Sequence, residues 1–236
     1  MAGTDLKAER KDLYAPRLGV FVDVVVPPMT FLAIDGSGDP NVSEDYRHAI
    51  EALFSASYAA KFLSKRELHR DYVVLPLEGQ WWAEDMAAFR TRDKARWSWC
   101  MMIRQPDWVG ADVLSEVVRI AEEKGAVAAS QLRPYTLDEG RCAQTLHVGS
   151  YDDEGPVLAR LHDEYLPQHS LKPRGLHHEI YLSDALERRD DVVPLSVPFK
   201  SVMLGGEQLG SGAENEGREQ DPGEQQEDTG EHPVPA

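Results

Sequence analysis

The chain has 236 residues, 41 of them acidic and 25 basic, and its formal charge of −16 argues against a general nucleic-acid binder, which needs a positive field to hold phosphates. Cys100 and Cys142 are too few for a disulfide framework and lie in apolar runs, where a reduced, buried thiol is the usual state. No apolar run approaches the roughly 20 residues that span a bilayer, and the polar N-terminus is not a signal peptide, so the composition predicts a cytoplasmic protein without a membrane partner.

The first half of the chain predicts a strand, a helix and two further strands. Residues 1–17 are expected as an N-terminal extension that precedes the domain. The apolar run Thr30–Asp35 ends in the turn sequence GSGDP, and Ser43 is a typical N-cap residue for the helix that follows. The apolar segments 71–79 and 96–106 are then expected as strands.

The second half repeats this order. A helix predicted over 111–124 ends at Gly125 and joins the two halves. The apolar run 142–156 closes in a polar turn and is followed by a helix, after which the segments 175–184 and 191–200 predict two more strands. Both halves therefore have the order βαββ.

This repetition predicts the fold class and the domain boundaries. We expect an α+β fold of two pseudo-symmetric βαββ repeats, similar to SH2 motifs, over residues 18–108 and 109–204. Their antiparallel sheets are expected to form a shared groove, with the helices on the outer face. Residues 205–236 contain nine acidic residues and one basic residue, hence −8 of the formal −16, and are expected to be a disordered acidic tail.

Several segments resemble the GyrI-like small-molecule-binding family, and more narrowly its stand-alone bacterial branch, which has no DNA-binding region. The similar segments are FLAIDGSGDP, VVLPLEGQWW, WCMMIRQPDWV, CAQTLHVGSYDDEGP and GLHHEIYLSD, and the resemblance covers roughly 18–200. It implies a groove that binds hydrophobic or cationic organic molecules. Members of the family serve as effector domains of multidrug-responsive transcription activators or as gyrase-inhibitory proteins, and some stand-alone members hydrolyse electrophilic toxins, including cyclopropane-bearing alkylators.

Glu179 is the main candidate for chemistry. Alternation along the strand places Glu179 and Tyr181 on the face opposite Ile180, so we expect both to project into the groove. A carboxylate there can balance a cationic ligand held by aromatic walls, or act as a general base on a water molecule. Tyr181 or Glu78 is expected to orient the water or protonate the leaving atom. The alternative is a solvated glutamate on an exposed sheet face.

Aromatic residues and histidines supply the expected ligand-binding wall. Adjacent residues of a strand point apart, so one residue of the tryptophan pair is expected in the core and the other, preferably Trp82, against the ligand. The alternative is that both close the sheet edge, and aromatic and methionine residues are more often packing than pocket. The expected ligand-binding residues are Trp81, Trp82, Trp99, Met101, Tyr135, His147 and His177.

Other chemistries lack their motifs. The eight histidines do not form HExxH or a comparable ligand spacing, so no metal is expected. GSGDP lacks the Lys and Ser/Thr of a phosphate loop, and no residue lies in a nucleophile elbow. We therefore expect no cofactor and no covalent intermediate.

Three functions fit these residues. The first is a hydrolase in which Glu179 activates water against a bound electrophile. The second is a binding module that sequesters or senses drugs without chemistry. The third is a partner-binding protein like the gyrase-inhibitory relatives, whose acidic tail resembles DNA or merely improves solubility. The sequence does not indicate the ligand or the oligomeric state.

Overall fold

A computed structural model of the chain describes residues 3–85, 88, 91–149, 153–182, 193–196 and 199–203. Residues 1–204 form one compact unit, and the acidic tail expected over 205–236 lies outside the described residues. Within the described part of the chain, no helix has the length and apolar character required to cross a membrane.

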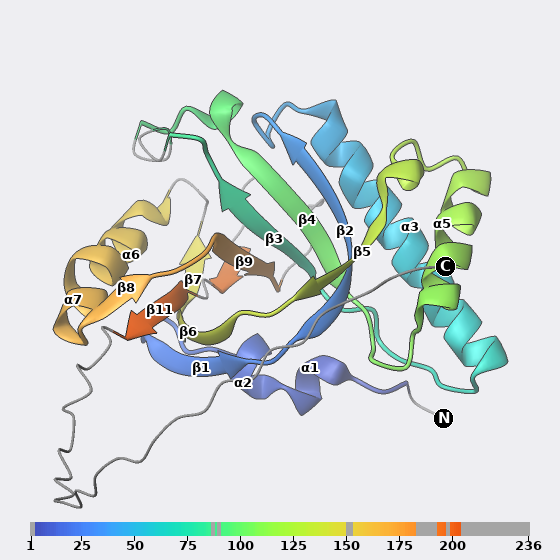
Figure 1. The fold of residues 1–236 in the computed structure, drawn as a ribbon, viewed down its shortest axis with the longest axis horizontal. Coiled ribbons are helices and arrows are strands. Elements are labelled where there is room, and N and C mark those ends of the chain that lie inside the picture. The colour runs from blue at the N-terminus through green and yellow to red at the C-terminus, as the bar shows by residue number, and fades with distance from the viewer. Residues whose placement is uncertain are drawn as a thin grey trace, which may run out of the picture. The chain divides into compact units, whose positions relative to one another are not determined.

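The fold combines two antiparallel sheets with helices on the outside, as expected for the α+β class (Figure 1). One sheet has seven strands in the order β5-β2-β4-β3-β9-β10-β7, and the other has four in the order β1-β6-β11-β8. The strands are β1 (Val22–Val26), β2 (Met29–Ser37), β3 (Leu77–Trp82), β4 (Ser98–Arg104), β5 (Arg133–Leu137), β6 (Gly140–Gln144), β7 (Leu146–Gly149), β8 (Leu171–Pro173), β9 (His177–Tyr181), β10 (Val193–Ser196) and β11 (Phe199–Met203).

The helices are mostly short, with two longer exceptions. They are α1 (Leu6–Glu9), α2 (Lys11–Tyr14), α3 (Glu44–Glu67), the 3₁₀ turns Lys94–Arg96 and Ala129–Gln131, α5 (Ala111–Glu123), α6 (Gly155–Ala159), a π-helical segment (Arg160–Tyr165) and α7 (Leu166–Gln168). The N-cap of α3 is the predicted one, because the Ser43 hydroxyl accepts a hydrogen bond from the Tyr46 backbone N–H at 3.2 Å. Gly125 follows α5 with a positive φ of 84°, which explains the predicted stop.

The two βαββ repeats meet at the centre of the seven-stranded sheet. The first repeat is β2-α3-β3-β4, and the second is β7, the α6–α7 helical segment, β9 and β10. Each repeat contributes three adjacent strands, and their order is mirrored about the β3–β9 pair. The register of that pair is centred on Gly79 opposite Glu179. The pseudo-twofold therefore runs beside the residue that the sequence indicated as the candidate base.

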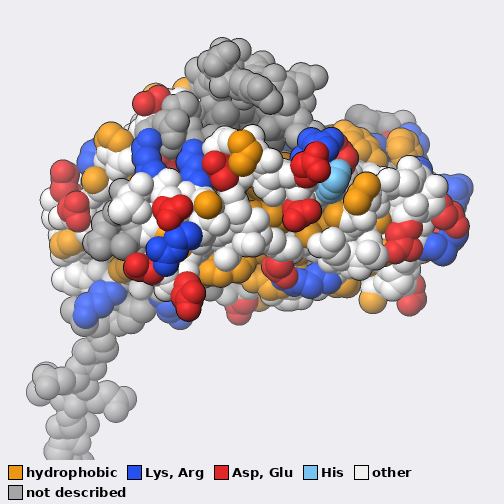
Figure 2. Space-filling model, turned by 90° about the horizontal axis from the view of Figure 1, so that it is seen from above, with side chains coloured by type: hydrophobic (Ala, Val, Ile, Leu, Met, Phe, Trp, Pro, Cys, Tyr) orange, Lys and Arg blue, Asp and Glu red, His pale blue; other side chains and the backbone are white. Residues whose placement is uncertain are grey.

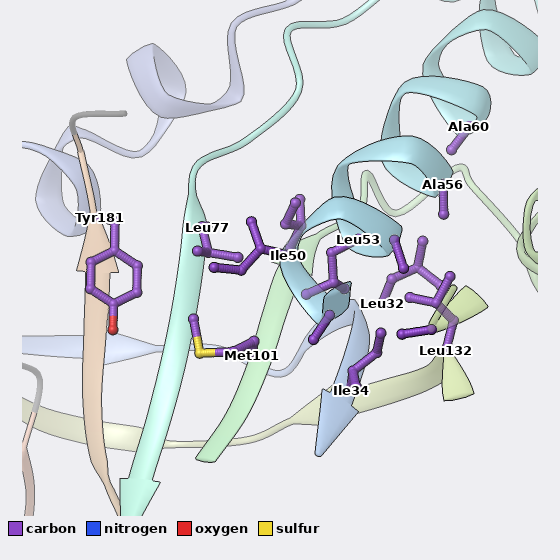
Figure 3. Close-up of a cluster of buried hydrophobic side chains, with 14 of the residues drawn as sticks. Leu32, Ile34, Ile50, Leu53, Ala56, Ala60, Leu77, Met101, Leu132 and Tyr181 are labelled. Carbon is purple, nitrogen blue, oxygen red and sulfur yellow. The ribbon is translucent and has the colours of Figure 1, made fainter. Parts of the chain in front are cut away.

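The main core lies between the seven-stranded sheet and the helices. Buried residues of α3, such as Ile50 and Leu53, pack against Leu77 of β3 and Met101 of β4. Figure 3 shows these side chains between helix and sheet, with Tyr181 reaching from β9 toward the same layer. The side of the sheet that carries Glu179 and Tyr181 is thus the helix-covered side.

The opposite side of the sheet is also covered. Leu13 of α2, Val24 of β1 and Cys142 of β6 pack with Met102 and Ile180 in a second buried cluster. The expectation of a groove on the face opposite the helices was therefore wrong in this detail. The N-terminal segment, expected as an extension, supplies Leu6, Leu13 and Tyr14 to this cluster, because these side chains bury apolar area on the sheet.

Some expected strands differ in extent. The segment predicted as a strand over 71–79 joins the sheet only from Leu77, since Pro76 has no N–H to donate to a ladder. The helix predicted after residue 156 includes a π-helical segment, and such segments are frequent near functional sites. The strands β1, β5 and β8 were not predicted.

Candidate functional site

Glu179 is held between two side chains of its own strand. Its Oε2 accepts a hydrogen bond from the Tyr181 hydroxyl at 2.6 Å, and its Oε1 lies 2.8 Å from Nε2 of His177. Alternation along β9 brings these three residues to one face, as the sequence predicted. Glu179 is only 4% exposed, so its carboxylate lies in an environment with little water and a low dielectric constant. Electrostatic interactions with the carboxylate are stronger there than in bulk water.

Trp81 fixes the direction of these hydrogen bonds. Its indole Nε1 donates to the Tyr181 hydroxyl oxygen at 3.0 Å, and the same hydroxyl donates its proton to Glu179. An indole N–H can only donate, so the chain of bonds runs from Trp81 through Tyr181 to Glu179. A Cβ at Gly79 would lie 3.1 Å from both the Trp81 nitrogen and the Tyr181 oxygen. The glycine therefore leaves room for this arrangement.

Aromatic rings surround the hydrogen-bonded chain. Tyr46, from the first turns of α3, packs edge-on against Trp99 at a centroid distance of 5.3 Å and lies 6.0 Å from the ring of Trp81. Trp81 in turn makes an edge contact with Trp97 at 5.8 Å. Burial first, and then the negative charge of Glu179, raises the pKa of Tyr46 well above its usual range. Both the wall and the carboxylate therefore belong to one site.

A second carboxylate approaches from the loop between β7 and α6 of the same repeat. Glu154, just before α6, His177 and Glu179 each present a ligand atom, and these atoms lie within 4.8 Å of one another. This donor set is compatible with a divalent metal such as zinc. Sequence reasoning missed Glu154, since nothing in the spacing of residues 154, 177 and 179 indicates that a loop brings them together. The expected lack of a metal stays a prediction.

Glu78 does not share this site. It faces the other side of the sheet, where its Oε2 lies 3.1 Å from Nε2 of His178 and its Oε1 accepts a hydrogen bond from Tyr14 at 3.1 Å. Nδ1 of the same His178 lies 2.8 Å from Oε2 of Glu139. The expectation that Glu78 works beside Glu179 was wrong because neighbouring strand positions point to opposite faces, and Glu78 pairs with Ile180.

The cluster of Glu78, His178 and Glu139 is a buried ionic triad. Glu78 is 0% exposed, and His178 and Glu139 are each 1% exposed. Burial by itself lowers the pKa of His178, but the negative charges of Glu139 and Glu78 outweigh it and raise the pKa to about 10. The imidazole is therefore a cation between two carboxylates at neutral pH, an arrangement that holds the N-terminal segment, β3, β9 and the β5–β6 connection together.

The remaining predicted ligand-binding residues divide between the two faces. Trp81, Trp99 and Met101 lie on the Glu179 face, and His177 contacts Glu179 directly. Trp82 packs with the opposite cluster, so the preference for Trp82 over Trp81 beside Glu179 was wrong. Tyr135 is on that opposite face too, where its hydroxyl donates to Gln80 at 3.1 Å. His147 lies on β7, separated from β9 by β10.

The chain is similar to solved structures from Listeria innocua over nearly their whole length. Two structures described as hydrolases from Listeria innocua share 31% and 33% identity with it, and each match covers 84% of this chain and 100% of the other, with a TM-score of 0.73. A conserved uncharacterized protein from Listeria innocua shares 33% identity over 83% of this chain and 99% of its own, also with a TM-score of 0.73.

Family membership rests on a broader match. No curated protein matches the chain. The profile of the GyrI-like small molecule binding domain, however, matches residues 24–198, which include both repeats and the Glu179 site. The chain belongs to the GyrI-like small molecule binding domain family.

Proposed function

We propose that this protein binds a hydrophobic, cationic or electrophilic small molecule beside Glu179 and hydrolyses an electrophilic toxin there. The observation that carries the proposal is the 2.6 Å hydrogen bond from Tyr181 to Glu179 inside an aromatic wall. The similarity to two Listeria innocua hydrolases adds support for hydrolysis as the reaction class. The flat rings and the negative charge of the site favour an aromatic cation, and the electrophilic toxin is the substrate class that the resemblance to the GyrI-like family implies.

The proposed reaction adds one water molecule. The water oxygen forms a bond to an electrophilic carbon, and the bond between that carbon and its leaving atom breaks. The Tyr181 hydroxyl turns from Glu179 and gives its proton to the leaving atom, while the Glu179 oxygen that it frees takes a proton from the water. The proton on Glu179 then returns to Tyr181 through their 2.6 Å contact. No cofactor or covalent intermediate is needed.

Two neighbours prepare Tyr181 and Glu179 for these roles. The Trp81 N–H stabilises negative charge on the Tyr181 oxygen while its proton is being transferred. His177 holds the other oxygen of the Glu179 carboxylate, which fixes the orientation of the base. Each of these residues is a positioning residue in this scheme, and Glu179 and Tyr181 are the catalytic pair.

A screen of small electrophiles and planar aromatic cations tests the proposal. Binding is measured by thermal shift and reaction by mass spectrometry, where hydrolysis adds the mass of water. We expect Glu179→Gln to lower turnover by at least about 100-fold while binding of neutral aromatic electrophiles persists. Tyr181→Phe should also lose turnover, whereas Tyr135→Phe, on the other face, should not. Unchanged hydrolysis by Glu179→Gln rules the mechanism out.

One observation favours a second function, a binding module without chemistry. Both oxygens of Glu179 already contact protein side chains. The carboxylate is therefore held in place, as expected of a residue that only balances the charge of a bound cation. In that case Glu179→Gln loses affinity for aromatic cations but not for neutral aromatic molecules, and no product accumulates with any ligand. The same screen therefore separates the two functions.

A further inference from the structure

Helix α3 carries a line of three aromatic side chains, of which Tyr58 and Phe62 are exposed and Phe54 is partly buried against the main core. Phe54, Tyr58 and Phe62 follow one another at intervals of four residues and lie on one side of the helix. Tyr58 is 48% exposed and Phe62 is 57% exposed, and the rings of Phe54 and Tyr58 are 6.5 Å apart. The other sides of α3 are largely buried against the sheet and α5 (Figure 1). The line is a narrow apolar ridge on an otherwise packed helix.

Opposite charges lie at the two ends of this ridge. Glu51 precedes Tyr58 by seven residues and Lys65 follows it by seven, so both lie close to the line of the aromatic residues. Their side chains are 47% and 61% exposed. A twofold rotation that reverses the helix about Tyr58 places Phe54 where Phe62 was and Glu51 where Lys65 was. The ridge is thus complementary to an antiparallel copy of itself.

We propose that a second copy of this chain covers the ridge, with the two α3 helices antiparallel across a twofold axis at Tyr58. This contact brings the two Tyr58 rings together on the axis. Phe54 of each copy lies at the level of Phe62 of the other, and Glu51 lies at the level of Lys65 of the other. An interface of this kind is isologous and closes after two copies.

The existing ion pairs of these charges do not prevent the contact. Glu51 lies 3.3 Å from Arg47, and Lys65 lies 2.9 Å from Asp71. The Glu51–Arg47 pair is exposed and contributes little to stability, and Asp71, whose side chain is 20% exposed, keeps its 3.0 Å contact with Lys61 when Lys65 turns to the other copy. Acidic and basic side chains also alternate on the face seen in Figure 2, so the charge of the described part is mixed locally even though the whole chain is acidic.

The expected dimer is weak. A helix of 24 residues is about 36 Å long, and a single pair of such helices buries less area than a standard protein interface. We therefore expect a monomer–dimer equilibrium that depends on protein concentration. The ridge faces away from the sheet and from Glu179, so this inference is independent of the proposed chemistry.

Sedimentation equilibrium of the full chain over a range of concentrations tests the inference. Tyr58→Arg places two cations on the axis and should raise the dimer dissociation constant by at least about tenfold. Glu51→Lys, which then faces Lys65 of the other copy, should also weaken the dimer. The double variant Glu51→Lys/Lys65→Glu should restore it, because the pair is complementary again with its signs exchanged. Val25→Arg, at a 66% exposed residue of β1, is the matched control and should dimerise like the wild type.

Each outcome decides the matter. Circular dichroism and thermal melting establish first that every variant is folded. A wild-type chain that stays monomeric at all concentrations overturns the proposal, as does a dimer that tolerates Tyr58→Arg. A double variant as weak as Glu51→Lys overturns the antiparallel register, even if the chain is dimeric. A ridge that binds only a different protein would appear as a monomer in this assay, and it would also contradict the proposal.

Discussion

The two faces of the sheet at the β3–β9 pair carry the same two residue types, a histidine and a glutamate, in different surroundings. On one face, the side chains of His177 and Glu179 are 15% and 6% exposed, and their hydrogen bonds end among aromatic rings. On the other face, the side chains of His178 and Glu78 are 2% and 1% exposed. His178 contacts Glu139, and Glu78 accepts a hydrogen bond from Tyr14. The first arrangement places a mostly buried carboxylate among aromatic rings, and the second holds a cation between two carboxylates that are more deeply buried.

This difference separates function from stability. Glu78, His178 and Glu139 are at most 1% exposed, so a ligand does not reach them and their charges act on stability. The same groups become costly if one partner is lost, since the others remain buried and unpaired. The His178 face should therefore respond to mutation mainly through the free energy of unfolding, and the His177 face mainly through binding and turnover.

The largest expected effect is that of His178→Gln. The substitution leaves the buried carboxylates of Glu78 and Glu139 without their shared cation, so the free energy of unfolding should fall by about 3–5 kcal/mol in urea titrations. His177→Gln, on the more open face, is the matched control and should cost less than about 1 kcal/mol. Equal losses for the two variants would contradict the division between the faces.

An intermediate effect is expected for Gly79→Ala. The added methyl group would lie 3.0 Å from the Met101 sulfur and 3.1 Å from the Trp81 nitrogen and the Tyr181 oxygen, so these side chains must shift. The free energy of unfolding should fall by about 1–3 kcal/mol, and the intrinsic tryptophan fluorescence should change because the Trp81–Tyr181 bond lengthens. If both stability and fluorescence stayed at wild-type values, the packing described around Gly79 would be incorrect.

The most gradual expected effect is a dependence of stability on pH. The two carboxylates raise the pKa of His178 to about 10 in the folded protein, whereas an unfolded histidine has an ordinary pKa of about 6.5. Since the folded state then binds more protons, the free energy of unfolding should fall as pH rises between these values. The slope contributed by His178 is at most about 1.4 kcal/mol per pH unit. Urea titrations from pH 7 to 9 measure it, and a wild-type slope that persists in Glu139→Gln would argue against the triad as its source.

Local patterns were sufficient for much of the fold. The N-cap at Ser43, the stop at Gly125 and the repeated βαββ order depend on residues close in sequence, and so does the placement of Glu179 and Tyr181 on one face of β9. Strand alternation also predicted that Trp81 and Trp82 point apart. It could not indicate which of them shares a side with Glu179, because that depends on the register between β3 and β9.

The rest depends on contacts between distant residues. Tyr14 and Glu78 are 64 positions apart, and the Glu139–His178 contact spans 39, so the ionic triad has no signature in sequence spacing. The N-terminal segment is mostly polar, so its sequence did not indicate that Leu13 and Tyr14 are buried. These two side chains cover the side of the seven-stranded sheet that was expected to be open. Glu154 reaches the site only because the loop before α6 lies beside β9 of the same repeat, 23 positions before His177 in the chain.

The most direct test is a comparison of Glu179→Gln with Glu78→Gln, each of which removes one carboxylate charge from one face of the same sheet. Urea unfolding measures the free energy of unfolding of both variants under identical conditions. We predict that Glu179→Gln stays within about 1 kcal/mol of the wild type, while Glu78→Gln loses about 3 kcal/mol or more. A loss for Glu179→Gln as large as that for Glu78→Gln would show that Glu179 is part of the structural framework and would contradict its assignment to the functional site.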